Sequence, residues 1–232
     1  MQLANWQITK VMAINNEKAQ VNIRVGDEKL EQVKEFIYLG AVITGDGSCQ
    51  KDIRYRIVKA SSVFARLNKI WKDKHVTIQT KINLYEVFVV SVFLHGVECW
   101  TLRKLDEHRI LTAEMGWLRK LAGISRRQRK KNEDIRLELN QMETLVEKIQ
   151  KRRLQWFGHV KRMDNSRLPA KALETLVSGT RSQGRQKKRW MDNVKQDLHQ
   201  RGSDIQQATK CTKDRKQWKK FVHAAPSSAT SG

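Results

Sequence analysis

The chain has 232 residues, of which 46 are lysine or arginine and 24 are aspartate or glutamate, so its formal net charge is +22 and its pI is about 10.2. A surplus of this size indicates a polyanionic partner. With 39% hydrophobic residues, seven tryptophans and two prolines, the composition excludes a chain that is disordered throughout and a collagen-like chain, and favours a helical globular protein.

The first part of the chain, 1–47, predicts two or three antiparallel strands. Hydrophobic and polar residues alternate from Ala19 to Val25, and Gly-Asp-Glu at 26–28 is a turn signal. A second run rich in strand formers spans 36–44 and ends at Gly-Asp-Gly, 45–47. We interpret these segments as a small β unit that precedes the helices.

After Cys49 the hydrophobic residues recur every three or four positions, which is the helical period. The pattern predicts helices at about 53–71, 77–98, 104–122, 143–158, 186–199 and 211–222. Segment 77–98 is apolar nearly all round, so we expect it to be the most buried helix. The expected fold class is mainly α with a small N-terminal antiparallel β element (α+β): a helical thumb-like bundle followed by a basic helical region.

Glycine-rich and small polar segments mark the expected flexible parts of the chain. Residues 178–185 predict a hinge, and the tail 224–232 predicts disorder. Cys49, Cys99 and Cys211 lie far apart, which excludes a disulfide framework and a zinc finger. The N-terminal residues do not resemble a secretory signal, and the longest apolar stretch is shorter than the roughly 20 residues of a membrane-spanning helix. We therefore expect an intracellular protein of the nucleus or cytoplasm, with no membrane partner.

The acidic and metal-binding residue types do not predict a catalytic centre. Polymerases and nucleases that use two metal ions need carboxylates that converge on one pocket. The chain has no Asp-Asp pair, and neighbours such as Asp106 and Glu107 face different directions on a helix. His95 and Cys99 could share one helical face, as a zinc site would require, but they lie in the most apolar segment. We expect a buried histidine and a buried cysteine there.

Basic clusters are the strong functional signal, because residues 101–232 hold 32 basic and 14 acidic side chains. Neutralising phosphates releases condensed counterions, so such densities indicate nucleic-acid binding. The predicted nucleic-acid-binding residues are Arg126, Arg127, Arg129, Lys130, Lys131, Lys151, Arg152, Arg153, Arg185, Lys187, Lys188 and Arg189. A further cluster surrounds Trp218 and contains Lys213, Arg215, Lys216, Lys219 and Lys220.

Several tryptophans adjoin these basic clusters. Trp156 and Trp190 sit at helical spacing with Val160, Val194 and Leu198, which favours core packing. The alternative is that an indole stacks on an unpaired base.

Five ordered segments resemble motifs of reverse transcriptases from non-LTR retrotransposons, of the LINE type and close to the RTE clade. They are similar to F-x-Y-L-G, L-Y-G-x-E-x-W, L-R-x-I-x-G-I-x-R, R-R-L-x-W-x-G-H-V-x-R-M and G-R-P-x-x-R-W-x-D-x-V. The matching residues are FIYLGAVIT at 36–44, LHGVECWTL at 94–102, LRKLAGISR at 118–126, RRLQWFGHVKRM at 152–163 and GRQKKRWMDNV at 184–194.

The resemblance implies a role for each part of the chain. Phe36, Tyr38, Leu39 and Gly40 would form the primer grip, which holds the primer 3′ end. Residues 48–123 would be the thumb, and 124–223 would bind template RNA or target DNA. In that family the catalytic Asp pair and its two divalent metals belong to the upstream palm. We therefore expect no cofactor in this chain, and a C-terminal fragment that binds RNA or DNA without polymerising.

Two alternatives remain open at this stage. A domesticated basic protein that packages nucleic acid would have the same composition. An enzyme in its own right, such as a nuclease, would require a carboxylate or metal constellation that the sequence does not show. Nothing in the sequence indicates an oligomeric state.

Overall fold

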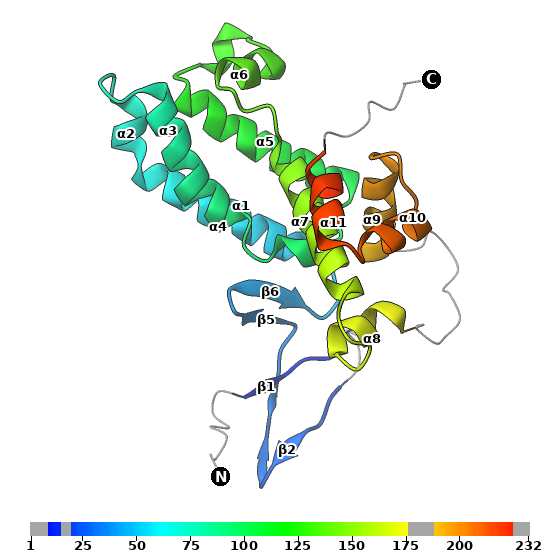
Figure 1. Cartoon of the computed structure of the whole chain (residues 1–232). Coiled ribbons are helices and arrows are strands. Elements are labelled where there is room, and N and C mark those ends of the chain that lie inside the picture. Colours follow the sequence, from blue (N-terminus) through cyan, green and yellow to red (C-terminus); the bar gives the residue numbers. More distant parts are fainter. Residues whose placement is uncertain (1–8, 15–19, 176–187, 225–232) are drawn as a thin grey trace.

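The strands gather at the N-terminal end of the chain, as expected, in a computed structural model that describes residues 9–14, 20–175 and 188–224. They are β1 (Lys10–Val11), β2 (Arg24–Val25), β3 (Glu28–Lys29), β4 (Glu31–Gln32), β5 (Glu35–Tyr38) and β6 (Ala41–Thr44). The expected fold class is confirmed, because helices make up most of the remaining described chain (Figure 1).

The pairing of these strands corrects the expectation of an all-antiparallel unit. β2 pairs with β3 and β5 pairs with β6, both antiparallel, but β1 pairs with β4 in parallel. Hydrophobic alternation predicts an extended segment and does not encode the direction of its partner. A parallel pair also needs a long connection, and here β1 and β4 are separated by the β2–β3 hairpin.

The described helices follow β6 without further strands. They are α1 (Gln50–Arg66), α2 (Asn68–Lys72), α3 (Ile78–Leu84), α4 (Ser91–Phe93), α5 (Lys104–Leu121), α6 (Asn132–Glu138), α7 (Leu145–Lys161), α8 (Leu168–Glu174), α9 (Trp190–His199), α10 (Ile205–Cys211) and α11 (Arg215–His223). Sequence periodicity missed α6, α8 and α10, which have seven residues each. Two turns are too short to establish a helical period.

The helix expected at 77–98 ends earlier and is less buried than predicted. A π-helical segment, Tyr85–Val90, joins α3 to α4, which ends at Phe93. Gly96 then adopts φ +74°, a left-handed conformation that favours glycine and that turns the chain out of the helix. His95 and Cys99 lie beyond the helix and are both exposed. The expectation that they are buried is therefore wrong, because both side chains face solvent although the neighbouring Val97 and Trp100 are buried in the core.

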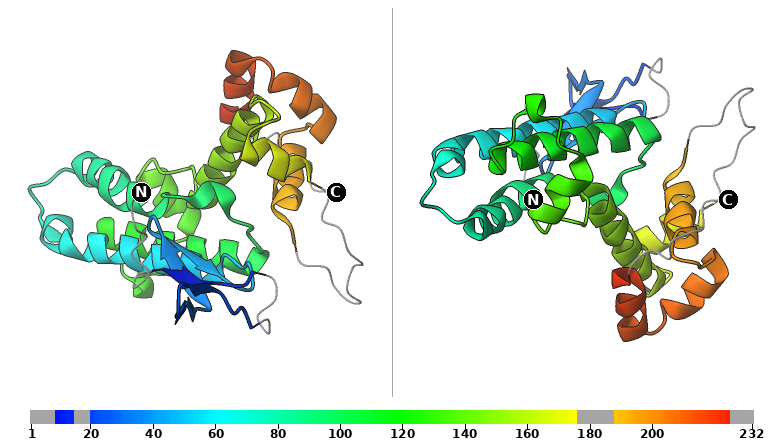
Figure 2. Two further views of the ribbon diagram at one scale, coloured as in Figure 1. Left: turned by 90° about the horizontal axis from the view of Figure 1, so that it is seen from below. Right: turned by 90° about the horizontal axis from the view of Figure 1, so that it is seen from above.

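Two hydrophobic cores share helix α7. The larger one is built from α1 to α5 and closes on the first turns of α7 at Leu145 and Ile149. The second contains Leu154 and Phe157 of α7 together with Trp218 and residues of α9 and α10. Figure 2 shows α7 between the bundle of α1 to α5 on one side and α9 to α11 on the other. The division of the chain into the four segments 1–47, 48–123, 124–223 and 224–232 stays a prediction.

Hydrogen bonds hold α9 against the loop that precedes α5. The indole Nε1 of Trp190 donates to the carbonyl of Glu98 at 2.8 Å. The Asn193 side chain accepts from the Leu102 amide at 3.0 Å and donates to the Leu102 carbonyl at 3.1 Å. The two cores are thereby joined through contacts outside α7 as well.

Two further expectations concern regions outside the described residues. The hinge predicted at 178–185 lies wholly outside them, and so does the tail from residue 225 onward. Among the described helices, none is long and apolar enough to cross a bilayer.

Candidate nucleic-acid interface

The β5–β6 hairpin carries Tyr38, Leu39 and Gly40 at its tip, and Phe36 further back on β5, where it pairs with Ile43. Leu39 and Gly40 occupy its turn with φ values of +49° and +81°. Two consecutive positive φ values characterise the hairpin turn in which Asn-Gly is preferred. Leucine there carries a cost of roughly 1–2 kcal/mol because its Cβ crowds the following carbonyl. The Leu39 side chain is nevertheless 78% exposed, so packing against the protein does not explain it.

Buried polar groups fix the hairpin on the helical bundle. Asp52 of α1 is buried; its Oδ1 accepts from the Val42 amide at 2.9 Å and its Oδ2 from Trp100 Nε1 at 2.7 Å. One turn further along α1, Arg56 Nη2 donates to the Gly40 carbonyl at 2.8 Å. The exposed tip is therefore presented by a rigidly held hairpin.

Helix α7 separates the residues of its motif onto two faces. Arg152, Trp156 and His159 follow one another at steps of four and three residues, which places them on one side of the helix. Leu154 and Phe157 on the opposite side are buried in the second core. Trp156 is 37% exposed, so the prediction that it is a core anchor is wrong.

Arg153 belongs to the buried face, which removes it from the predicted nucleic-acid-binding residues. Its side chain is 1% exposed, and Nη1 donates to Asp197 Oδ2 of α9 at 2.6 Å. The side chains of successive helical residues point about 100° apart around the helix axis. The side chain of Arg153 points toward α9. A phosphate cannot reach it.

Side-chain contacts connect the hairpin with the outward face of α7. Arg56 Nη2, which holds the hairpin turn, also lies 2.9 Å from His95 Nδ1. The adjacent Leu94 carbonyl accepts a hydrogen bond from Arg152 Nη1 at 2.5 Å. The segments 36–44, 94–102 and 152–163 are therefore linked by side-chain contacts in the folded chain. The separate sequence motifs did not indicate this proximity.

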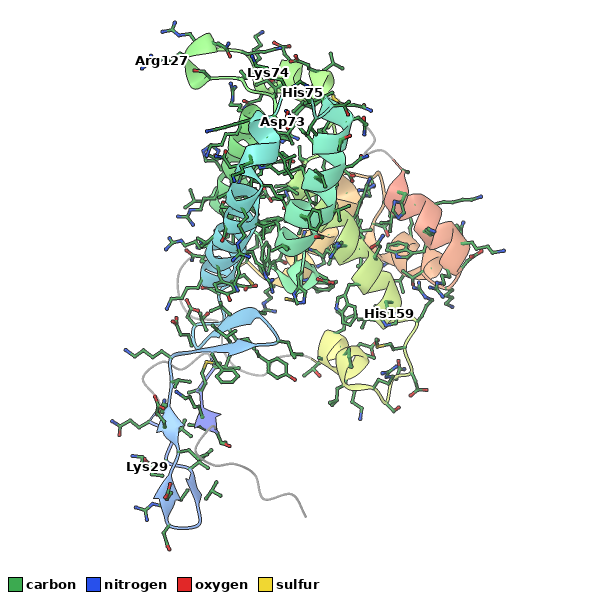
Figure 3. The ribbon with its side chains drawn as sticks, turned by 90° about the vertical axis from the view of Figure 1, so that its left-hand side faces the viewer. Lys29, Asp73, Lys74, His75, Arg127 and His159 are labelled. Carbon is green, nitrogen blue, oxygen red and sulfur yellow. The ribbon has the colours of Figure 1, made fainter. Side chains whose placement is uncertain are left out.

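The remaining basic clusters lie in different places. Figure 3 shows Arg127 at the end of the bundle where Asp73, Lys74 and His75 connect α2 with α3, whereas His159 lies close to α8. Near Arg127, the exposed side chains of Arg129 and Lys131 also reach solvent, while Lys130 is bonded to Glu138. The side chain of Arg126 is outside the described part of the chain.

Some of the other predicted nucleic-acid-binding residues form contacts within the protein. Lys151 pairs with Glu143 at 2.6 Å, and Lys188 Nζ donates to Gln196 Oε1 at 3.0 Å. Arg189 is exposed at the start of α9. Arg185 and Lys187 fall outside the described residues.

Helix α11 and its approach carry the most open cationic surface. Lys213, Arg215, Lys216, Lys219 and Lys220 are all exposed, and none forms an ion pair within the described residues. Trp218 in their midst is buried, and its Nε1 donates to the Leu154 carbonyl of α7 at 3.1 Å. Burial and the neighbouring charge of Arg215 both lower the pKa of the Arg162 guanidinium on α7. Cations therefore crowd together here.

The acidic side chains do not form a metal site in the part of the chain that the structure describes. A hollow of about 910 Å³ is lined by three aspartates. Asp106 is buried and bonded to Arg103 and Arg109. Asp192 accepts from the Arg189 amide, and Asp46 accepts from Thr44 and Ser48. These carboxylates serve as helix caps and turn acceptors.

Comparison with known proteins points to a mobile element. Over 198 residues, the chain is 29% identical to an uncharacterized transposon-derived protein of Caenorhabditis elegans. The match spans 82% of this chain and 70% of that protein. It supports a transposon origin for the chain. No family model matches the sequence, and no solved structure does.

Proposed function

We propose that this chain is the nucleic-acid-binding C-terminal part of a LINE-type reverse transcriptase and that its role is to hold RNA or DNA. The observation that carries the proposal is the open cationic surface of α11 and its approach, where the exposed lysines and Arg215 form no ion pair with any described acidic residue. A folded protein gains little from such a concentration of like charge unless a polyanion neutralises it. The similarity to a transposon-derived protein agrees with this proposal.

Within this proposal, the β5–β6 hairpin holds the end of a primer. The exposed Tyr38 and Leu39 at its tip offer an apolar contact to a sugar or a base. Asp52 and Arg56 hold the tip in place, so binding needs little ordering of the protein. The polymerase chemistry would reside in the upstream palm of the family.

The salt dependence of binding tests the proposal directly. Affinity for single-stranded RNA and for DNA should fall steeply between about 50 and 200 mM salt, because counterions compete for the phosphates. Replacing Lys216, Lys219 and Lys220 with alanine should reduce the slope of log K against log salt by roughly 0.7 to 0.9 per lost contact. Fluorescence anisotropy with labelled oligonucleotides measures both quantities.

A matched control removes the same charge from lysines that are paired. Lys10, Lys148 and Lys161 contact Glu31, Glu86 and Glu174. Their joint replacement with alanine should leave the slope nearly unchanged. Affinity that does not depend on salt, or equal effects of the two triple variants, would contradict the proposal.

Leu39→Asn should stabilise the fold and weaken primer binding. Asparagine tolerates the left-handed conformation and forms the preferred Asn-Gly turn, so we expect a gain of about 0.5–1 kcal/mol in unfolding free energy. The apolar contact with a recessed primer end is lost, so affinity for that ligand should fall. Urea titration and anisotropy measure the two effects. Leu168→Asn, at another exposed leucine, is the control and should not affect binding.

A further inference from the structure

A hollow of about 330 Å³ lies beside the outward face of α7. It is lined by Glu98, Arg152, Gln155, Trp156 and His159. The Trp156 and His159 rings form one wall, with centroids 5.5 Å apart and planes inclined by 43°. An indole that remains 37% exposed at such a hollow offers a flat face to a ligand.

Glu98 supplies an acceptor at the same place. Its Oε2 is buried and has no hydrogen-bond partner within the described residues. The backbone around it is held, because the Glu98 carbonyl accepts from Trp190 Nε1. A buried carboxylate oxygen without a donor is unfavourable, and a ligand that brings a donor would relieve that cost.

Arg152 adds a positive charge and hydrogen-bond donors to the lining of the hollow. Arg152 uses Nη1 for the Leu94 carbonyl, which orients its guanidinium at the rim of the hollow. A guanidinium has five N–H donors in total, and a phosphate is one of its preferred partners. The exposed His159 lies about two helical turns further along α7.

We propose that this hollow binds one unpaired guanine nucleotide of a single-stranded nucleic acid. The base stacks on the Trp156 indole, its N1–H and 2-amino groups donate to the Glu98 carboxylate, and Arg152 contacts the phosphate. The inference rests on the proposed function and specifies which ligand this face recognises.

The choice of guanine follows from hydrogen-bond chemistry. Stacking on an indole is available to every base and does not discriminate among them. A carboxylate only accepts hydrogen bonds. Guanine presents two adjacent donors to it, whereas adenine and cytosine present one amino group, and uracil flanks its single N–H with two carbonyl oxygens that repel the carboxylate.

The test uses the full chain and short oligouridines that differ at one central position. Replacing the central uracil with guanine should strengthen binding by about tenfold, the usual effect of hydrogen bonds to a charged acceptor. Hypoxanthine, which lacks the 2-amino group, should lose most of that gain. Glu98→Gln should remove the guanine preference without weakening oligouridine binding, because it also removes the repulsion between the carboxylate and the uracil carbonyls.

Trp156 variants test the stacking contact separately. Trp156→Ala should weaken binding of every single-stranded oligonucleotide by at least about fivefold, and Trp156→Phe should restore part of the affinity. Phe88→Ala removes another exposed aromatic side chain, one that does not line the hollow, and should have no effect. Thermal melts of each variant confirm that the fold is retained, because Trp156 lies outside both cores.

The outcomes separate this inference from the proposed function. If the wild-type chain binds no oligonucleotide at any salt concentration, the proposed function fails. If it binds all central bases equally, or if Trp156→Ala binds as wild type does, the guanine site is wrong while the proposed function stands. A preference for guanine that persists in Glu98→Gln also overturns the site.

Discussion

Arg153→Ala should lower the free energy of unfolding by about 3–5 kcal/mol, because it leaves the Asp197 carboxylate buried without its cation. Asp197 is 2% exposed and accepts from Arg153 at 2.6 Å. Chemical denaturation followed by circular dichroism measures the loss. Lys151→Ala removes a partly exposed ion pair from the same helix turn and should cost less than about 1 kcal/mol.

The loss of unfolding free energy in Arg153→Ala should depend on pH. Burial raises the pKa of the Asp197 carboxyl to about 6, although the charge of Arg153 opposes that rise. Since this folded pKa lies above the unfolded value, protonation favours the folded chain, and the stability that it provides is lost as pH rises through about 6. Without Arg153 the pKa rises further. The deficit of the variant should therefore be largest above about pH 6 and smaller near pH 4.

A double variant distinguishes a stranded charge from a simple loss of packing. Arg153→Met combined with Asp197→Leu replaces the pair with apolar side chains of similar size, and should recover most of the lost stability. If the double variant is as unstable as Arg153→Ala, the ion pair contributes through packing and not through the unpaired carboxylate.

Gly158→Ala should cost at least about 3 kcal/mol of unfolding free energy, because the new methyl group collides with a buried ring. A Cβ at position 158 would lie 2.0 Å from Nε1 and 2.4 Å from Cδ1 of Trp218. The indole would have to shift, and its hydrogen bond to the Leu154 carbonyl would break. Denaturant titration measures the loss.

Gly116→Ala is the matched control for this substitution. Gly116 lies inside α5, and apart from its chain neighbours and the adjacent backbone of α5, no atom of the described residues comes within 4 Å of the position that its Cβ would occupy. Alanine there should raise stability by roughly 0.5–1 kcal/mol through helix propensity. A smaller residue at position 218 should also relieve the collision, so Gly158→Ala should cost less in a Trp218→Leu background. Equal costs in both backgrounds would contradict the steric explanation.

Gly158 and Arg153 account for the structural role of the segment at 152–163. Gly158 allows α11 to approach α7 closely, and Arg153 ties α7 to α9. Trp156 and His159 belong to neither core and line the hollow, together with Arg152, which also donates to the Leu94 carbonyl. One motif therefore combines residues that hold the fold with residues that we propose bind a nucleotide.

Several properties of this chain are determined by sequence alone. The surplus of basic residues, the strand-forming run at 36–44 and the helical segments near 53–71, 104–122 and 143–158 are encoded by composition and by local periodicity, although the structure divides that run into β5 and β6. Such patterns extend over many residues, so single exceptions do not hide them. The mainly α fold class follows from the same signals.

Only the tertiary structure decided whether Arg152 or Arg153 can contact a ligand. Arg152 and Arg153 are the same residue type, and either could have faced solvent, yet one lines the hollow and the other is buried against Asp197. The partner that makes the difference lies 44 residues away on α9. Likewise Gly96 ends the helix expected at 77–98, which leaves His95 in contact with Arg56 instead of in the core. Helical periodicity gives the angle between successive side chains, but the direction of the core depends on helices that are remote in sequence.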